Sequence, residues 1–212
     1  ARTGAGPVLT VCSGRPQPFV EAMCRLVGNL ALPAICENGV WVWDPTDNAY
    51  LLDPRISAGH IETIRAAETW AREMLGPRGV AIQPGKTAML SLFHPEPEAL
   101  REIAAEAEEA FRERGWDLRV SMTVTYINCD LPFVSKASGI ERFTERTGLG
   151  REELAGVGDT PSDLAIRERV RWFACPANAD DELKAAADYV SPHKEARGVL
   201  EIVERLRDGA AG

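Results

Sequence analysis

The segment Ala155-Gly-Val-Gly-Asp-Thr-Pro-Ser-Asp-Leu-Ala-Ile166 combines a short apolar run, a turn with two carboxylates and the start of a second apolar run. The first run is typical of the end of a buried strand, and Pro161 with Ser162 favours the first turn of a helix. In open α/β sheets, ligands bind at the carboxyl ends of the strands. The segment therefore predicts an α/β fold with a polar site at Asp159 and Asp163.

These two carboxylates suit a hard cation, because Mg²⁺ usually binds through one or two carboxylates together with water and phosphate oxygens. A second interpretation remains open on the spacing alone. In it, Asp163 only complements the dipole of the helix and Asp159 only shapes the turn.

Composition limits the class of protein. A chain of 212 residues can form one large domain or two small ones. The net charge of −8 and the pI near 5.0 argue against a nucleic-acid surface, but they allow a local positive pocket for a phosphorylated metabolite. Five scattered cysteines without a CxxC pair indicate reduced thiols, and no apolar run is long enough to span a membrane. We therefore expect a cytoplasmic protein without nucleic-acid or membrane partners.

Strand and helix patterns alternate at both ends of the chain. Residues 45–126 differ, because their helix–strand–helix–strand pattern is typical of an antiparallel sheet covered on one side. We predict a doubly wound, Rossmann-like parallel-sheet core formed by residues 1–44 and 127–212, with residues 45–126 inserted as a small α/β cap domain. An exposed cap sheet could also pair between two copies, so a homodimer is one expectation.

Other strand ends of the predicted core also carry polar residues. In Ser13-Gly14-Arg15, a hydroxyl beside glycine can bind a phosphate oxygen or simply cap the following helix. Asn38 stands in an Asn-Gly turn between two apolar runs, which is a strong hairpin signal. Lys136 begins a helix, where its charge opposes the macrodipole, and neutralising a phosphate is one reason for that position.

Together these segments resemble the haloacid dehalogenase superfamily. "VLTVCSGRP" (8–16), Lys136 and "GVGDTPSDLAI" (156–166) resemble its second, third and fourth motifs. "AICENGVWVWD" (34–44) and "ACPANADDELKAAADYVS" (174–191) resemble segments of its Cof-like branch, which carries a C2B-type cap. The resemblance covers roughly residues 7–44 and 128–206. Within the branch, the proline of "GDTPSD" resembles mannosyl-3-phosphoglycerate phosphatases, and the compact cap resembles phosphoglycolate phosphatases.

The resemblance implies a role for each candidate residue. Ser13 would bind the transferring phosphoryl group, and Gly14 would allow close backbone approach. Lys136 would act in catalysis by neutralising the phosphate and the nucleophile. Asp159 would bind Mg²⁺ directly, and Asp163 would bind the metal or a water on it.

On the substrate side, Arg15 and Asn38 would line the pocket. The activity implied is Mg²⁺-dependent hydrolysis of a small phosphorylated sugar or hydroxy acid through an aspartyl-phosphate. The cap would exclude water and select the leaving group.

One feature departs from the superfamily. Its first motif, D-x-D-G-T/S, carries the nucleophile one βα unit before the "SGR" segment, and the sequence has no such motif there. Asp44, Asp47, Asp53 and Asp130 lie at the wrong places to replace it. We interpret the chain as a fragment that lacks the first core strand and is inactive alone. Two alternatives are a non-catalytic module that binds a phosphate ligand and a phosphomutase.

Overall fold

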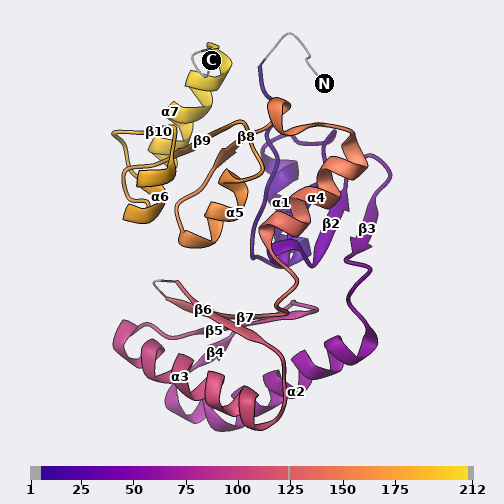
Figure 1. Cartoon of the computed structure of the whole chain (residues 1–212), viewed down its shortest axis with the longest axis vertical. Helices are drawn as coiled ribbons and strands as arrows, with labels where there is room; N and C mark the ends of the chain where they lie inside the picture. The colour runs from indigo at the N-terminus through magenta and orange to yellow at the C-terminus, as the bar shows by residue number, and fades with distance from the viewer. Residues whose placement is uncertain (1–5, 124, 210–212) are drawn as a thin grey trace.

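The computed structural model describes residues 6–123 and 125–209, which form an α/β structure with three sheets (Figure 1). The helices are α1 (Gln17–Leu26), α2 (Ala58–Met74), α3 (Pro97–Glu113), α4 (Lys136–Thr147), α5 (Leu164–Arg167), α6 (Asp181–Ala186) and α7 (Glu195–Arg207). The strands are β1 (Ala34–Cys36), β2 (Trp41–Asp44), β3 (Ala49–Leu52), β4 (Ala81–Ile82), β5 (Met89–Phe93), β6 (Arg119–Met122), β7 (Tyr126–Asp130), β8 (Ala155–Val157), β9 (Trp172–Cys175) and β10 (Tyr189–Val190).

The lower part of Figure 1 is a four-stranded antiparallel sheet in the order β4-β5-β7-β6. Helices α2 and α3 lie on one side of it. Residues in a strand point alternately to its two faces, so Leu90, Leu92 and Ile127 pack against these helices in a buried core with Phe111. The opposite face points towards the rest of the molecule (Figure 1).

In the upper part, β1, β2 and β3 form an antiparallel sheet. The predicted Asn-Gly hairpin is confirmed, because Asn38 and Gly39 have φ angles of 52° and 109° between β1 and β2. The strand expected from the apolar run before Ser13 is reduced to one parallel bridge between Cys12 and Ile35. On the other side of the Cys12 segment, no described strand lies beside it. The segment therefore does not form a longer ladder.

The parallel strands expected of a doubly wound core are found in the sheet β10-β9-β8. One hydrophobic cluster joins this sheet to the β1–β3 sheet, since Ile35, Phe143 and Phe173 belong to the same buried core. The two sheets therefore form one packed unit, although the described strands leave them unpaired with each other.

A cavity of about 140 Å³ separates the two sheets and is lined by Cys12, Ile35, Gly156 and Val157, among others. The Val11 carbonyl accepts a hydrogen bond from the Ile35 amide at 2.8 Å, and the Ser13 amide donates to the Ile35 carbonyl at 2.9 Å. Alternate peptide groups of a strand point to opposite sides. The peptide groups of Cys12 therefore face this cavity, opposite the edge of β8.

Helix α1 does not bury the apolar face that its helical spacing predicts. Helical spacing places Phe19, Met23 and Leu26 on one face, yet all three are exposed, Leu26 by 81%. Val20 and Cys24 are buried instead, against β1 and β2. Leu26 has the least cover of the three, whereas the Arg15 guanidinium lies over the Phe19 ring, 5.6 Å from its centre.

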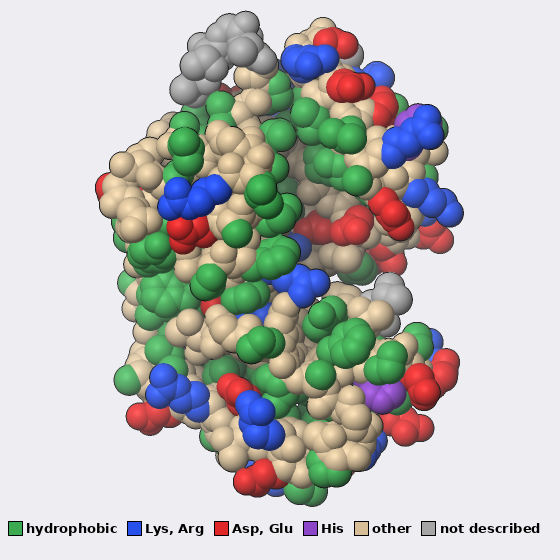
Figure 2. Space-filling model, turned by 180° about the vertical axis from the view of Figure 1, so that it is seen from behind, with side chains coloured by type: hydrophobic (Ala, Val, Ile, Leu, Met, Phe, Trp, Pro, Cys, Tyr) green, Lys and Arg blue, Asp and Glu red, His purple; other side chains and the backbone are tan. Residues whose placement is uncertain are grey.

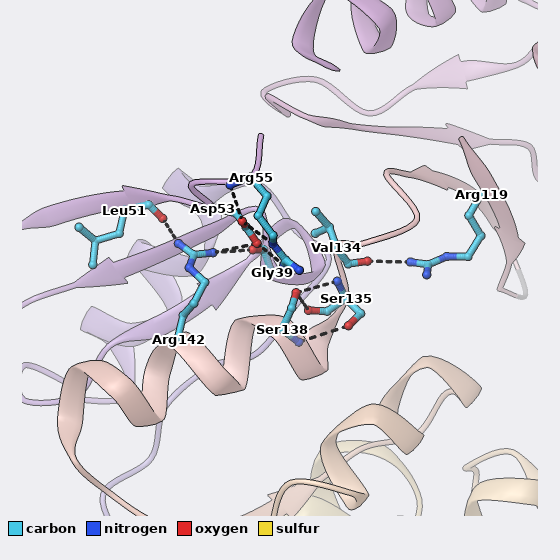
Figure 3. Close-up of polar contacts among 9 residues, drawn as sticks. All are labelled: Gly39, Leu51, Asp53, Arg55, Arg119, Val134, Ser135, Ser138 and Arg142. Atoms are coloured by element: carbon cyan, nitrogen blue, oxygen red, sulfur yellow. Dashed lines mark hydrogen bonds and ion pairs between the residues drawn. The ribbon is translucent and has the colours of Figure 1, made fainter. Parts of the chain in front are cut away.

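Two chain segments connect the upper and lower parts, and polar contacts hold both (Figure 3). Asp53, fully buried, accepts hydrogen bonds from Arg55 and lies 3.9 Å from the Arg142 guanidinium. Arg142 donates to the carbonyls of Gly39 and Leu51. On the second segment, Arg119 donates to the Val134 carbonyl at 2.9 Å.

The strand pairing indicates where the predicted cap domain begins and ends. Strand β3 pairs with β2, and β7 pairs with β5 and β6. We therefore propose boundaries for the predicted cap near residues 53 and 131 rather than 45 and 126. In the described residues no helix is both long and apolar enough to cross a bilayer, and all five cysteines are free thiols.

Candidate active site

Backbone hydrogen bonds join the Ser13–Arg15 loop to the Glu37–Gly39 turn. The Asn38 amide donates to the Ser13 carbonyl at 3.0 Å, and the Glu37 amide donates to the Arg15 carbonyl at 3.0 Å. Ser13 does not cap α1, whose N-cap is Pro16. Its hydroxyl oxygen instead accepts the Arg15 amide at 3.2 Å, which leaves the hydroxyl hydrogen free for a ligand.

The Glu37–Gly39 turn is strained and tightly packed. Glu37 and Asn38 both have positive φ, at 49° and 52°, an unusual conformation for residues other than glycine. A Cβ on Gly39 would lie 2.3 Å from the Ser135 carbonyl oxygen, so only glycine lets the start of α4 pack directly on this turn. This contact places Lys136, the first residue of α4, beside the Ser13 loop.

Lys136 and Asp163 form a buried ion pair with Nζ and Oδ1 2.5 Å apart. Lys136 is 8% exposed, and its ammonium also donates to the Ser162 hydroxyl at 3.1 Å. Burial alone lowers the pKa of Lys136, but the negative charge and hydrogen bond of Asp163 outweigh burial and raise it. Lys136 therefore stays charged at neutral pH.

The second oxygen of Asp163 holds the loop that precedes it. Oδ2 accepts the backbone amides of Asp159 and Thr160 at 3.0 and 3.1 Å and the Thr160 hydroxyl at 3.1 Å. A Cβ on Gly158 would lie 2.3 Å from the Asp163 Cβ, so glycine is needed there. Both oxygens of Asp163 are therefore engaged within the protein.

Asp159 is the free carboxylate of the site. It is exposed, and none of the described side chains hydrogen-bonds or pairs with it. Loss of hydration and then the nearby charge of Asp163 raise the pKa of Asp159, partly offset by Lys136. A raised carboxyl pKa marks a position where a cation would be stabilised.

The donor set fits Mg²⁺ only in part. The described residues contain no cluster of three or more His, Cys, Asp or Glu side chains arranged to hold a metal ion. Mg²⁺ needs as few as one or two protein carboxylates. Asp159 suits direct binding, whereas Asp163 suits an indirect role because its oxygens are already used.

Cys12 lies beside this group. Burial raises the pKa of its thiol to about 12, partly opposed by the charge of Lys136. The thiol is thus protonated at neutral pH and unsuited to act as a nucleophile.

The remaining predicted residues, Arg15 and Asn38, face the lower sheet. The Arg15 guanidinium carbon lies 5.2 Å from the ring centre of Tyr126 on β7. Asn38 is buried, and a Cβ on Gly14 would lie 2.9 Å from its Oδ1 atom, so Gly14 lets Asn38 approach. The structure thus brings all seven predicted site residues to connected loops at one end of the upper part.

Sequence reasoning missed three residues at this junction. Glu37 is 1% exposed, and its Oε2 atom accepts the amides of Thr87 and Ala88 at 2.8 and 3.3 Å. Lys86 is the residue directly before Thr87. Burial raises the pKa of the Asp130 carboxyl, and a hydrogen bond with the Asn38 side chain partly opposes this rise. A carboxylate in an otherwise plain turn was the available signal for Glu37, and no motif marked Lys86.

Comparison with known proteins identifies the family of the chain. The family model for haloacid dehalogenase-like hydrolases matches residues 61–203. Phosphoglycolate phosphatase 1 of Saccharolobus solfataricus is 38% identical over 74 residues, which are 35% of this chain and 32% of that protein. The match thus spans about a third of that relative's length.

Two further comparisons cover most of the chain. The phosphoglycolate phosphatase of Halorubrum lacusprofundi is 26% identical over 199 residues, or 94% of this chain and 83% of that protein. The crystal structure of a haloacid dehalogenase-like hydrolase from Bacteroides thetaiotaomicron aligns with a TM-score of 0.70 at 18% identity, covering 92% of this chain and 85% of that one. At 18% identity, the match to the Bacteroides thetaiotaomicron structure shows a shared fold alone.

The chain belongs to the haloacid dehalogenase-like hydrolase family. The predicted resemblance and the α/β, Rossmann-like fold class are confirmed.

Proposed function

We propose that the complete protein is a phosphatase that hydrolyses phosphoric monoesters of small metabolites with the help of Mg²⁺. The observation that carries this proposal is the buried Lys136–Asp163 pair beside the free carboxylate of Asp159 and the Ser13 hydroxyl. A fixed ammonium, a hydroxyl donor and a cation-binding carboxylate are the groups that a phosphoryl group requires. Relatives named phosphoglycolate phosphatases support the same activity.

Each residue has a task in this proposal. The Ser13 hydroxyl and the backbone beside Gly14 bind phosphoryl oxygens, and the Lys136 ammonium neutralises their charge. Asp163 holds Lys136 and the Asp159 loop in place, and Asp159 holds the cation. When bound, Mg²⁺ supplies positive charge against the phosphoryl oxygens.

The nucleophile is proposed to come from a further strand. Cys12 and the edge of β8 face each other across the 140 Å³ cavity, and their peptide groups are available for pairing there. A parallel strand between them would end next to Ser13 and Asp159, where a strand-end aspartate could attack phosphorus.

The test uses the complete polypeptide with p-nitrophenyl phosphate and Mg²⁺. We expect turnover, its loss in Asp159→Asn, and retained turnover in Asp181→Asn, which changes an exposed carboxylate on α6 as a matched control. Full activity of Asp159→Asn would contradict the site. Stabilisation by inorganic phosphate without turnover would instead favour the non-catalytic binding module.

A further inference from the structure

The loop that joins β4 to β5, residues 83–88, lies against the candidate active site. A Cβ on Gly85 would lie 3.7 Å from the Pro16 Cβ atom. Pro16 directly follows the Ser13–Arg15 loop, so the β4–β5 loop borders the proposed phosphate site. The border between the upper and lower parts of the molecule is hollowed, and charged side chains gather there (Figure 2). A loop at this border is placed to control entry to the site.

The β4–β5 loop is held to its own sheet. The Gln83 amide donates to the Ser91 carbonyl at 2.9 Å, and the Lys86 ammonium donates to the Ser91 hydroxyl. The Ser91 hydroxyl donates in turn to the Asn128 Oδ1 atom on β7 at 2.6 Å. All these bonds lie within the lower part of the molecule, so they would remain if the loop moved away from the active-site loops. The loop and its sheet can therefore move as one piece.

Glu37 supplies a polar contact across the border. Its backbone belongs to the upper part, where the Glu37 amide donates to the Arg15 carbonyl at 3.0 Å. Its side chain reaches the lower part, where Oε2 accepts the Thr87 and Ala88 amides at 2.8 and 3.3 Å. Hydrogen bonds to a charged carboxylate are stronger than those between neutral groups. One side chain thus ties the β4–β5 loop to the active-site loop.

The same contact has a cost. Glu37 is 1% exposed, and its second oxygen, Oε1, is buried without a hydrogen-bond partner among the described residues. Burial raises the pKa of the Glu37 carboxyl, and the two amides and the charge of Lys86 only partly oppose that rise. The Glu37 backbone is also held at a positive φ of 49°, a strain typical of switch regions. Separation of the loop from Glu37 would return water to Oε1, which makes the contact reversible.

We propose that Glu37 is a reversible latch, a side chain that holds the β4–β5 loop closed over the phosphate site and releases it for substrate entry and product release. The proposal rests on the proposed phosphatase function and adds a positioning residue to it. With the loop closed, less water surrounds the phosphoryl group, so the charge of Lys136 acts on it more strongly. Glu37 contacts neither phosphate nor cation and acts only through the position of the loop.

Hydrogen exchange of the complete protein tests the latch independently of activity. In Glu37→Leu the Thr87 and Ala88 amides lose their acceptor and should exchange at least about 10-fold faster than in the wild type. Glu37→Gln keeps an acceptor oxygen and should retain most of the protection. Glu153→Leu is the matched control, because the exposed Glu153 also accepts a backbone amide, that of Gly150, before the start of β8. Equal protection in Glu37→Leu and the wild type would overturn the proposal.

A covalent lock tests whether the loop must open, and it stays informative if Glu37→Leu fails to fold. In Pro16→Cys/Gly85→Cys the two Cβ atoms lie 3.7 Å apart, within the range that a disulfide spans. Gly85 has a φ of 84°, which strains a cysteine there, so the reduced form of the same variant is the control. Glutathione disulfide should block turnover of p-nitrophenyl phosphate, and dithiothreitol should restore it. Full turnover by the cross-linked form would contradict the latch.

The latch and the phosphatase function can fail separately. If the complete protein does not hydrolyse p-nitrophenyl phosphate, the phosphatase proposal fails, and the exchange comparison alone decides the latch. Faster exchange in Glu37→Leu with a kcat/KM about 10-fold below the wild type, both restored in Glu37→Gln, would support both proposals. Turnover by the wild type with unchanged exchange in Glu37→Leu would overturn the latch alone.

Discussion

Two lysines of this protein are largely buried, and their surroundings differ. Lys136 lies against Asp163, which also ties down its own loop, so charge and hydrogen bonds are balanced within the protein. Lys86 contacts a hydroxyl, a thioether and no carboxylate among the described side chains. The pKa values of the two lysines move in opposite directions. The charge and hydrogen bond of Asp163 raise the pKa of Lys136, whereas burial lowers the pKa of Lys86 to about 8. The first lysine is balanced by a direct ion pair, whereas the second has the charges of Glu37 and Asp130 nearby but makes no ion pair among the described residues.

The largest effect should follow from breaking the balanced pair. Lys136→Met leaves Asp163 buried without its counter-charge and should lower the free energy of unfolding by about 3–5 kcal/mol. Urea denaturation measures this loss. The double variant Lys136→Met/Asp163→Asn removes both charges and should recover part of the stability. A double variant less stable than the sum of the two single changes would contradict the pairing.

An intermediate effect is expected from pH. The folded pKa of Lys86 is about 8, against 10.5 for an ordinary lysine, so between these values the unfolded chain binds more protons than the folded one. The contribution of Lys86 to stability should therefore rise as pH increases from about 8 to 10.5, by about 1–3 kcal/mol.

The groups facing Lys86 that affect its titration are Glu37, Asp130, Arg15 and Cys129. Lys86→Met should lack the rise, which denaturation curves at several pH values would reveal as the difference from the wild type. The same slope in both proteins would show that Lys86 is not the group responsible.

The smallest effect should come from Asp159. Its raised carboxyl pKa means that the charged form is disfavoured in the folded protein, so Asp159→Asn should slightly raise the melting temperature without metal at neutral pH. The variant should also lose any stabilisation by Mg²⁺ that the wild type displays. Scanning calorimetry with and without Mg²⁺ checks both, and a lower melting temperature without metal would contradict the assignment.

Much of the site could be predicted from local sequence. The Asn-Gly turn, the start of α4 at Lys136 and the Asp159–Asp163 loop depend on residues close together in the chain. Local backbone preferences are sufficient to indicate such features. Periodicity also placed helices correctly, but it could not tell that the Phe19–Leu26 face of α1 is exposed, because burial depends on what packs against the helix.

The sequence by itself determined the class of fold and the charged loop around Lys136 and Asp163, since short-range spacing encodes both. Only the tertiary structure decided the surroundings of Lys86. Its partners Ser91 and Asn128 are 37 residues apart and meet through strand register, and Glu37 reaches the next loop 50 residues away. Contacts of that range are set by the packing of a sheet against distant loops, which no local pattern specifies.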